Sequence, residues 1–262
     1  MTALTAAGVR VALGGVPVVR DVSFSVGDGE WLTVIGPNGA GKSTLLHAVA
    51  GLLPFTGDVR WHGDDPAGLH RRQRSRRVAV VPQHPVVPTG MSVFDYILLG
   101  RTPHLPFLGR ESPADLSVVA AVCERLDLTG LAGRRLDTLS GGERQRVFLA
   151  RALAQLSGAG RALLLLDEPT SALDIGHQQE VLELVDSLRR DGGLTVVSTM
   201  HELSVAGEYA DRLLLLAAGE VVAAGPPAEV LTVPLLTRHY RANVMVVDTS
   251  AGPAVVPVRP GR

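Results

Sequence analysis

An eight-residue segment, Gly36-Pro37-Asn38-Gly39-Ala40-Gly41-Lys42-Ser43, constrains this 262-residue chain more than any other feature. Its three glycines allow the backbone to turn tightly enough for several N–H groups to point at phosphate oxygens. Lys42 adds positive charge for the β- and γ-phosphates of a nucleoside triphosphate, and Ser43 offers a hydroxyl ligand for Mg²⁺. An apolar, β-rich run precedes the segment, and a predicted helix with Thr44 in its first turn follows it. This order of strand, glycine loop and helix predicts a nucleoside-triphosphate site rather than a chance glycine loop.

A run of four leucines, residues 163–166, is followed by two carboxylates. A buried strand would present these acids at the edge of a parallel sheet where ligands bind. Asp167 can then hold Mg²⁺, and Glu168 is placed to orient or deprotonate an attacking water molecule. Taken alone, such a pair is more often a solvated strand end. The phosphate loop upstream favours the catalytic interpretation.

A second phosphate-type element is the segment Leu139-Ser140-Gly141-Gly142-Glu143, which opens a predicted helix. Ser140 is a candidate N-cap, with Glu143 completing a capping box. The same helix end offers N–H donors and a positive dipole to a phosphate, and the two interpretations are compatible. Because the chain already has one phosphate loop, this element needs a γ-phosphate bound by another subunit.

Continuous leucine and valine runs predict strands buried on both faces and therefore a mainly parallel sheet in an α/β fold. An antiparallel β region is predicted at 18–26, before the phosphate strand 31–35. Further strands are predicted at 57–63, 78–81, 162–166, 194–199, 212–216 and 220–224, with a β pair at 244–247 and 255–258. Helices are predicted at 113–126, 142–156, 176–190, 203–209 and 231–240. We expect one domain, 1–262: a nucleotide-binding core with a β subdomain at 1–84 and 159–225, a helical subdomain at 85–158, and a C-terminal extension at 226–262.

Charge and composition exclude several classes of protein. The net charge of −1 gives no general attraction to nucleic acid, so no nucleic-acid partner is expected. A single cysteine, Cys123, excludes an internal disulfide and favours a reducing, cytoplasmic location. No signal peptide is evident at the start, and the longest apolar runs are far shorter than a membrane span. A basic cluster, Arg71, Arg72, Arg74, Arg76 and Arg77, is interpreted as a solvated helix face or loop edge, with a phosphate or partner contact as the alternative.

Together these motifs resemble, in order and spacing, the ATP-binding subunit of ABC transporters over residues 13–224. Residues 36–43 resemble the Walker A loop and residues 163–167 the Walker B strand of a P-loop NTPase core. Gln83 matches the Q-loop, residues 139–143 the LSGGQ signature with Glu143 in last position, and Glu168 the catalytic carboxylate. Residues 171–174, Ser171-Ala172-Leu173-Asp174, match the D-loop, and His201 the switch histidine.

The resemblance implies a head-to-tail homodimer that sandwiches ATP and Mg²⁺ between two chains. One chain would bind ATP through residues 36–44. The other would contribute Ser140, Gly141, Gly142, Glu143 and Asp174. Ser43, Gln83 and Asp167 would hold Mg²⁺, with Glu168, His201 and Gln83 in catalysis. The chain departs from the family at Leu13, which occupies the position of the usual adenine-stacking aromatic residue and predicts weaker base discrimination.

Two further segments resemble importers of iron-siderophores, haem or cobalamin: Gly100-Arg101-Thr102-Pro103-His104, and Leu173-Asp174-Ile175-Gly176-His177-Gln178. The resemblance implies an ATPase at the cytoplasmic face of the membrane that powers a transmembrane permease and, indirectly, serves an extracellular substrate-binding protein. An ordinary proline-containing loop is the alternative for residues 100–104. A soluble ABC ATPase and an exporter subunit are the alternatives for the chain.

Overall fold

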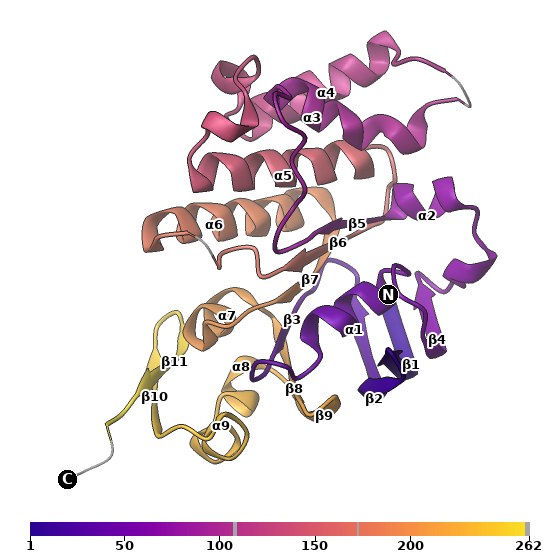
Figure 1. The fold of residues 1–262 in the computed structure, drawn as a ribbon. Helices are drawn as coiled ribbons and strands as arrows, with labels where there is room; N and C mark the ends of the chain where they lie inside the picture. The colour runs from indigo at the N-terminus through magenta and orange to yellow at the C-terminus, as the bar shows by residue number, and fades with distance from the viewer. Residues whose placement is uncertain (107–108, 172, 260–262) are drawn as a thin grey trace. The chain divides into compact units, whose positions relative to one another are not determined.

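The computed structural model describes residues 1–106, 109–171 and 173–259 (Figure 1). The chain divides into two compact units, which are described separately. The first comprises residues 1–66 and 195–262, and the second residues 67–194. Ala172 of the expected D-loop lies outside the described residues. The subdomain boundaries expected from the sequence remain a prediction.

The first unit contains a three-stranded antiparallel sheet with the order β2-β1-β4. Its strands are β1 (Thr2–Leu13), β2 (Val16–Gly27) and β4 (Thr56–Trp61). The sequence predicted the regions of β2 and β4 but missed β1, which pairs with both of them. Four register shifts along the β1–β2 pair interrupt the alternation of apolar and polar residues that would identify a strand. The antiparallel partner of β2 is therefore β1, and the phosphate strand belongs to another sheet.

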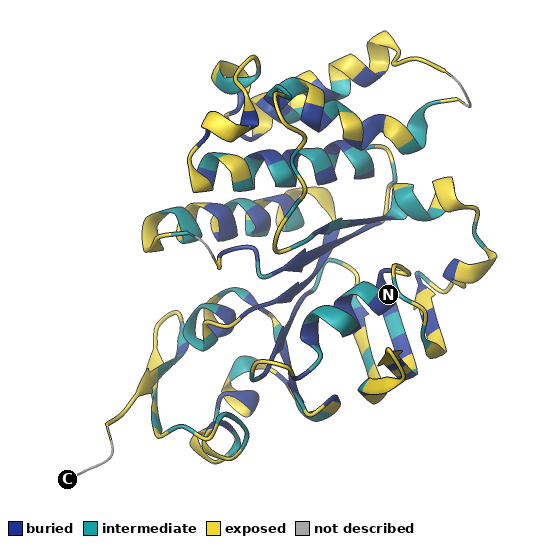
Figure 2. Ribbon diagram, in the orientation of Figure 1, coloured by how far each residue is buried: buried dark blue, intermediate teal, exposed yellow. Residues whose placement is uncertain are grey.

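Parallel strands form the centre of the first unit, as expected. Strand β3 (Trp31–Ile35) pairs in parallel with β7 (Leu194–Thr199) and β8 (Arg212–Ala217), and β9 (Glu220–Gly225) is antiparallel to β8. Every residue of β3 and β7 is buried (Figure 2), as expected for central strands of a parallel sheet. The other elements of this unit are α1 (Lys42–Val49), α7 (Leu203–Tyr209), α8 (Pro227–Val230), α9 (Val233–Tyr240), β10 (Val244–Thr249) and β11 (Gly252–Pro257).

The helix expected at 231–240 is confirmed as α9, and the four-residue helix α8 lies just before the expected range. Thr232 has an extended backbone and separates them. Pro234 follows in the first turn of α9, where its missing N–H group costs nothing. The expected β pair in the C-terminal extension is confirmed as the antiparallel hairpin β10–β11.

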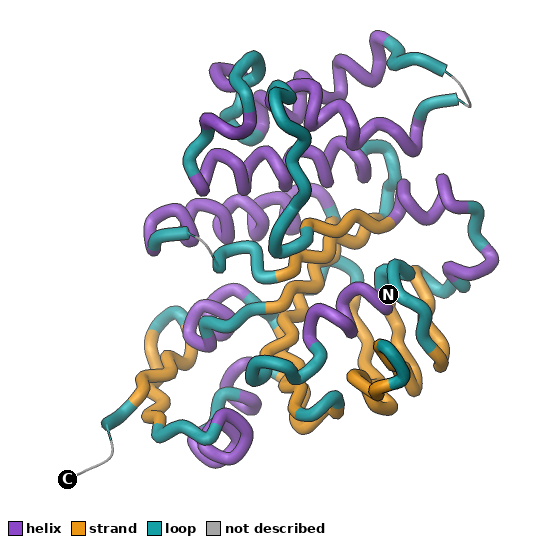
Figure 3. Tube along the Cα trace, in the orientation of Figure 1, coloured by secondary structure: helices purple, strands orange, loops and turns teal. Residues whose placement is uncertain are grey.

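The second unit is mostly helical (Figure 3) and contains one parallel strand pair, β5 (Val78–Val81) and β6 (Ala162–Asp167). Its α-helices are α2 (Arg71–Arg77), α3 (Val93–Leu98), α4 (Pro113–Arg125), α5 (Gly141–Leu156) and α6 (Ile175–Gly192). Short 3-10 helices are η1 (Pro66–Gly68), at the border of the units, and η2 (Leu99–His104), η3 (Thr129–Leu131) and η4 (Leu136–Thr138). Helix α5 packs against α3, α4, α6 and β5 and so forms the core of the unit. Helix α2 buries none of its residues, which favours the solvated-face interpretation of the basic cluster.

The helices of the second unit begin where their sequences place capping residues. Ser112 accepts a hydrogen bond from the backbone N–H of Asp115, and Pro113 occupies the first turn of α4. Ser92 caps α3 in the same way. Among the described residues, no helix combines the length and the apolar character that crossing a membrane requires.

Candidate active site

The phosphate loop of the first unit has backbone geometry that only glycine can supply at two positions. Gly36 has a φ of 151°, and a Cβ atom there would lie 2.0 Å from the carbonyl oxygen of Leu216. Gly41 has a φ of 100°, and a Cβ atom would lie 2.9 Å from the carbonyl oxygen of Val18. The loop therefore packs directly on neighbouring backbone, which fixes its curvature.

The first turn of α1 is arranged to receive an anion. Gly41 is the N-cap and has no side chain to cover the N–H groups of that turn, which contains no acidic residue. Lys42 is buried, and its Nζ donates hydrogen bonds to the carbonyl oxygens of Gly36, at 3.0 Å, and Pro37, at 3.3 Å. The ammonium group is thus held inside the loop, where a phosphate would bind. Ser43 and Thr44 belong to the same turn, and Asn38, Gly39 and Ala40 complete the loop.

His201 lies at the same sheet edge as the phosphate loop. Strands β3 and β7 are parallel neighbours, with Val34 opposite Thr199, so their carboxyl ends meet at one edge. The N–H of Met200 donates to the carbonyl oxygen of Val34 at 3.3 Å. The exposed His201 follows directly. Leu13 ends β1 with 44% of its surface exposed. Its side chain is therefore accessible for apolar contact with a nucleotide base.

In the second unit, two expected catalytic residues, Gln83 and Glu168, lie just beyond the ends of neighbouring parallel strands. Val81 of β5 lies opposite Leu166 of β6, so Gln83 and Glu168 each follow this residue pair by two positions. The Nε2 group of Gln83 donates a hydrogen bond to Oε2 of Glu168. Glu168 has a φ of 49°, a left-handed conformation that non-glycine residues seldom adopt and that is concentrated at functional sites.

Asp167 immediately precedes Glu168 and ends β6 with only 4% of its surface exposed. A carboxylate held this deeply at the end of a rigid strand is a suitable cation ligand. The leucine run of β6, all of it buried, provides the rigidity.

The N-terminus of α5 has the capping box that the sequence predicted. Ser140 Oγ accepts a hydrogen bond from the N–H of Glu143 at 3.2 Å, and Glu143 Oε2 accepts one from the N–H of Ser140 at 2.7 Å. The N–H of Ser140 is the largest cause of the lowered pKa of the Glu143 carboxyl. Glu143 therefore remains ionised and fixes the first turn, which also contains Gly141 and Gly142.

A hollow of about 270 Å³ brings these parts of the second unit together. It is lined by residues of the Q-loop segment, the start of α5 and the segment after β6, among them Gln83, Gly141, Arg144, Gln145, Glu168 and Ser171. The carboxylate of Glu168 and the guanidinium of Arg144 thus border one space. This arrangement can hold a polar molecule next to a general base.

Asp174 is the N-cap of α6, and its Oδ1 accepts a hydrogen bond from the N–H of His177 at 3.0 Å. The pKa of Asp174 is lowered, chiefly by this bond. The sequence predicted a role for Asp174 and none for His177. The spacing was a usable signal, because a residue at an N-cap and the residue three positions later often contact each other.

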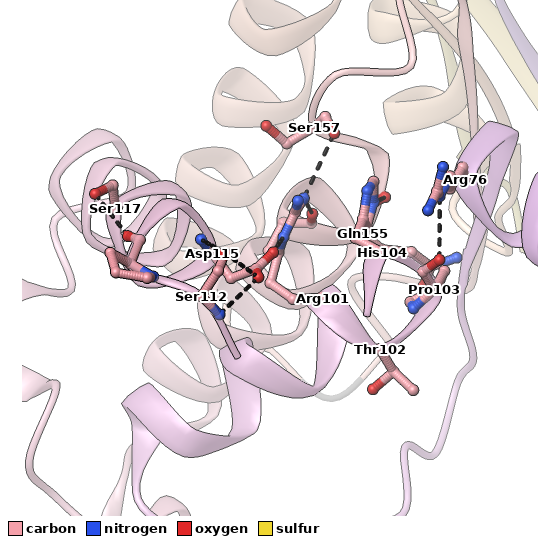
Figure 4. A network of polar contacts seen from close by, with 12 residues as sticks. Arg76, Arg101, Thr102, Pro103, His104, Ser112, Asp115, Ser117, Gln155 and Ser157 are labelled. Carbon is pink, nitrogen blue, oxygen red and sulfur yellow. Dashed lines mark hydrogen bonds and ion pairs between the residues drawn. The ribbon is translucent and has the colours of Figure 1, made fainter. Parts of the chain in front are cut away.

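The segment 100–104 belongs to η2 rather than to an ordinary loop, and it is bound to the C-terminal end of α5 (Figure 4). Arg101 is buried and donates to Asp115 Oδ1 at 2.9 Å and to the carbonyl oxygen of Ala154 at 2.7 Å. A Cβ atom on Gly100 would lie 2.3 Å from the carbonyl oxygen of Arg151. The Nε2 atom of His104 lies 2.8 Å from the carbonyl oxygen of Gln155. These contacts are structural: they fix the end of α5.

The strand, glycine loop and helix of the first unit define a P-loop nucleotide-binding protein. In the second unit, strand β6 separately ends in Asp167, which Glu168 follows. The model of the family described as ABC transporter matches residues 19–171, more than half of the chain. The chain belongs to the ABC transporter family and is its ATP-binding, ATP-hydrolysing component.

The chain is 42% identical over 256 residues to a hemin import ATP-binding protein of Myxococcus xanthus, a match covering 95% of each protein. It is 37% identical over 248 residues to a ferric enterobactin transport ATP-binding protein of Escherichia coli, covering 94% of this chain and 90% of that protein. Cobalamin import ATP-binding proteins of Halobacterium salinarum also match, over 99% of this chain and 64% of their own length. The fold resembles a chain of a metal-chelate type ABC transporter in an inward-facing conformation, with a TM-score of 0.84, 29% identity, and coverage of 99% of this chain and 98% of that chain.

Proposed function

We propose that this chain powers an importer whose cargo is an iron-siderophore, haem or cobalamin. The observation that carries this proposal is the similarity, over nearly the full chain, to ATP-binding proteins that serve import of these three classes. Residues 100–104 and 173–178 support it, because both segments resemble the corresponding segments of these importers in sequence.

The working form would be a head-to-tail homodimer with two ATP sites. Each site would take its phosphate loop, residues 36–44, from one chain and Ser140 to Glu143 with Asp174 from the other. The uncovered N–H groups of α1 would bind phosphate oxygens, and the capped first turn of α5 would meet the γ-phosphate from the opposite side. Closure then depends on a phosphate that hydrolysis removes, so that cleavage favours opening.

Glu168 would act on the attacking water molecule, and Gln83 would hold its carboxylate in place. The hydrogen bond from Gln83 Nε2 orients the Glu168 carboxylate, which would accept a proton from the water. His201, at the edge beyond β7, would contact the γ-phosphate. Positioning, proton acceptance and phosphate contact would thus be divided among Gln83, Glu168 and His201.

Ser43, Gln83 and Asp167 would supply the protein ligands of Mg²⁺. All three offer oxygen, which this hard cation prefers. Within the described ranges, no group of three or more His, Cys, Asp or Glu side chains is placed to hold a metal ion. A cation that takes few protein ligands and completes its shell with phosphate oxygens and water matches this sparse set. When bound, Mg²⁺ would neutralise charge on the β- and γ-phosphates.

The chain would bind a transmembrane permease at the cytoplasmic face, and the permease would receive cargo from an extracellular substrate-binding protein. Purification of the tagged chain from detergent extracts of its own cells tests this. We expect a stable complex with a multi-spanning protein, and stimulation of ATP hydrolysis in that complex. Recovery with ribosomes or DNA instead would support the soluble ABC ATPase. Cargo efflux rather than uptake by vesicles containing the complex would support the exporter.

A further inference from the structure

His177 contacts two segments that the composite ATP site requires. Its Nδ1 atom lies 2.8 Å from both Oδ1 and Oδ2 of Asp174. Since Oδ1 also accepts the backbone N–H of His177, the Asp174 carboxylate is held in one orientation by main chain and ring together. The D-loop acid is therefore not a freely rotating surface side chain.

The carbon edge of the same ring packs on Gly142 in the first turn of α5. A Cβ atom on Gly142 would lie 2.4 Å from Cδ2 and 3.0 Å from Cγ of His177, closer than any side chain could tolerate. The starts of α5 and α6 thus meet through this imidazole. Any shift of one helix start displaces the ring and, with it, Asp174.

Gln178, the next residue, secures the main chain of the same loop. Its Nε2 donates to the carbonyl oxygen of Leu173 at 3.1 Å and lies 3.4 Å from that of Thr170. His177 therefore fixes the Asp174 side chain, and Gln178 fixes the backbone that carries it.

We propose that His177 is a positioning residue for ATP hydrolysis: it joins Asp174 to the signature turn at Gly142, so that both reach the partner chain's nucleotide in fixed relative positions. This inference rests on the proposed composite site. It adds a residue to that site and a physical reason for the Asp-x-x-His spacing. The ring needs a donor at Nδ1 to hold Asp174 and a flat edge to fit Gly142, and histidine has both.

The charge of His177 adds a pH dependence to this contact. The hydrogen bond to Asp174 is the largest cause that raises the pKa of His177; Glu180 raises it further, and Arg146 of α5 opposes the shift. The imidazolium therefore stays protonated at pH values where an ordinary histidine is neutral, and it holds Asp174 as an ion pair. As pH rises through the raised pKa, the ring loses its charge and the contact weakens.

Three substitutions separate the two features of the ring. His177→Ala removes the donor and the packing edge, His177→Phe keeps only the edge, and His177→Asn keeps a donor near the position of Nδ1 without titrating. We expect His177→Ala to lower kcat about ten- to a hundredfold through misplacement of Asp174. Equilibrium binding of ATP to the monomer should remain unchanged, because the phosphate loop is untouched. His177→Phe should resemble His177→Ala, and His177→Asn should restore most of the loss.

The matched control is Gln179→Ala, an exposed position in the same turn of α6. It should keep wild-type turnover. The pH profile supplies a readout that a purely structural role would not change. The ratio of wild-type kcat to that of His177→Asn should fall as pH rises beyond 6.5, the ordinary pKa of histidine, because the imidazolium deprotonates.

A double-mutant cycle tests the contact with Gly142. Gly142→Ala should be more damaging with His177 present than in the His177→Ala background, where the added methyl group has room. Wild-type kcat in His177→Ala, or additive effects in the cycle, would overturn the proposal. Failure of the composite site itself would be recognised separately, since Glu168→Gln would then not accumulate dimers with ATP.

Discussion

Gln83 donates a hydrogen bond from its side-chain amide to the carboxylate of Glu168, across the ends of the parallel strands β5 and β6. The two residues are 85 positions apart in the chain. Because each follows the paired residues Val81 and Leu166 by two positions, the parallel register alone brings them to one edge. The bond orients the carboxylate that would act on water, and it places the Q-loop in direct contact with that carboxylate.

Glu168→Gln should bind ATP but hydrolyse it at least about a hundredfold more slowly, because the amide cannot accept a proton from water. The bound ATP would persist, so closed dimers should accumulate and be visible by size-exclusion chromatography with ATP and Mg²⁺. Glu183→Gln, an exposed carboxylate on α6, is the matched control. A Glu168→Gln protein that stays monomeric and turns over normally would refute the role.

Lys42→Ala should lose ATP affinity. The change removes a buried ammonium group and its two hydrogen bonds to the loop carbonyls of Gly36 and Pro37. The expected loss is about 2 to 3 kcal/mol of binding free energy, measured by titration calorimetry. Arg60→Ala, which removes an exposed basic side chain in the same unit, should leave affinity unchanged. Equal affinity in the Lys42→Ala and wild-type proteins would contradict this role.

Arg101→Ala should destabilise the second unit by about 3 to 5 kcal/mol, because it removes the buried cation paired with Asp115 and the hydrogen bond to the carbonyl oxygen of Ala154. Urea denaturation measures the loss. The control is Arg135→Ala, which breaks an exposed pair with Asp137 and should cost less than about 1 kcal/mol. Similar losses in the two variants would show that η2 does not brace α5 (Figure 4).

Acid should weaken the same brace in a defined pH range. Hydrogen bonds from the hydroxyl and N–H of Ser112, with Arg101 contributing less, lower the pKa of Asp115 to about 2 from its ordinary 3.8. The folded pKa is depressed, so the carboxylate stabilises the fold above pH 3.8, and this contribution is lost as pH falls toward 2. The stability difference between wild type and Asp115→Asn should therefore shrink over this interval. A difference that is constant with pH would argue against an ionised Asp115.

Leu13 should give weak discrimination between adenine and guanine, since an aliphatic side chain makes apolar contact without stacking. Wild-type protein should therefore hydrolyse GTP as well as ATP. Leu13→Tyr should strengthen ATP binding by about 1 kcal/mol through stacking. Leu52→Tyr, at another exposed leucine of this unit, should not. Strict adenine preference in the wild type would contradict the expectation.

The sequence predicted the buried parallel strands, the phosphate loop and the start of α5 well, because each depends on local chemistry. Glycines at 36 and 41, a capping pair at 140 and 143, and the leucine run of β6 all act within a few residues. The N-terminal strand β1 was missed because its bulges disrupt the alternation. Helix α8 was missed because its four residues are too few to show a helical period.

By itself, the sequence determined that this protein binds and hydrolyses ATP. A phosphate-binding loop consists of consecutive residues, and the identity of each residue sets its backbone flexibility and its charge. Only the tertiary structure decided how Gln83 meets Glu168, how His177 joins Asp174 to Gly142, and how Arg101 holds the end of α5. Each of these contacts joins segments through packing and strand register, which depend on the whole folded unit rather than on neighbouring residues.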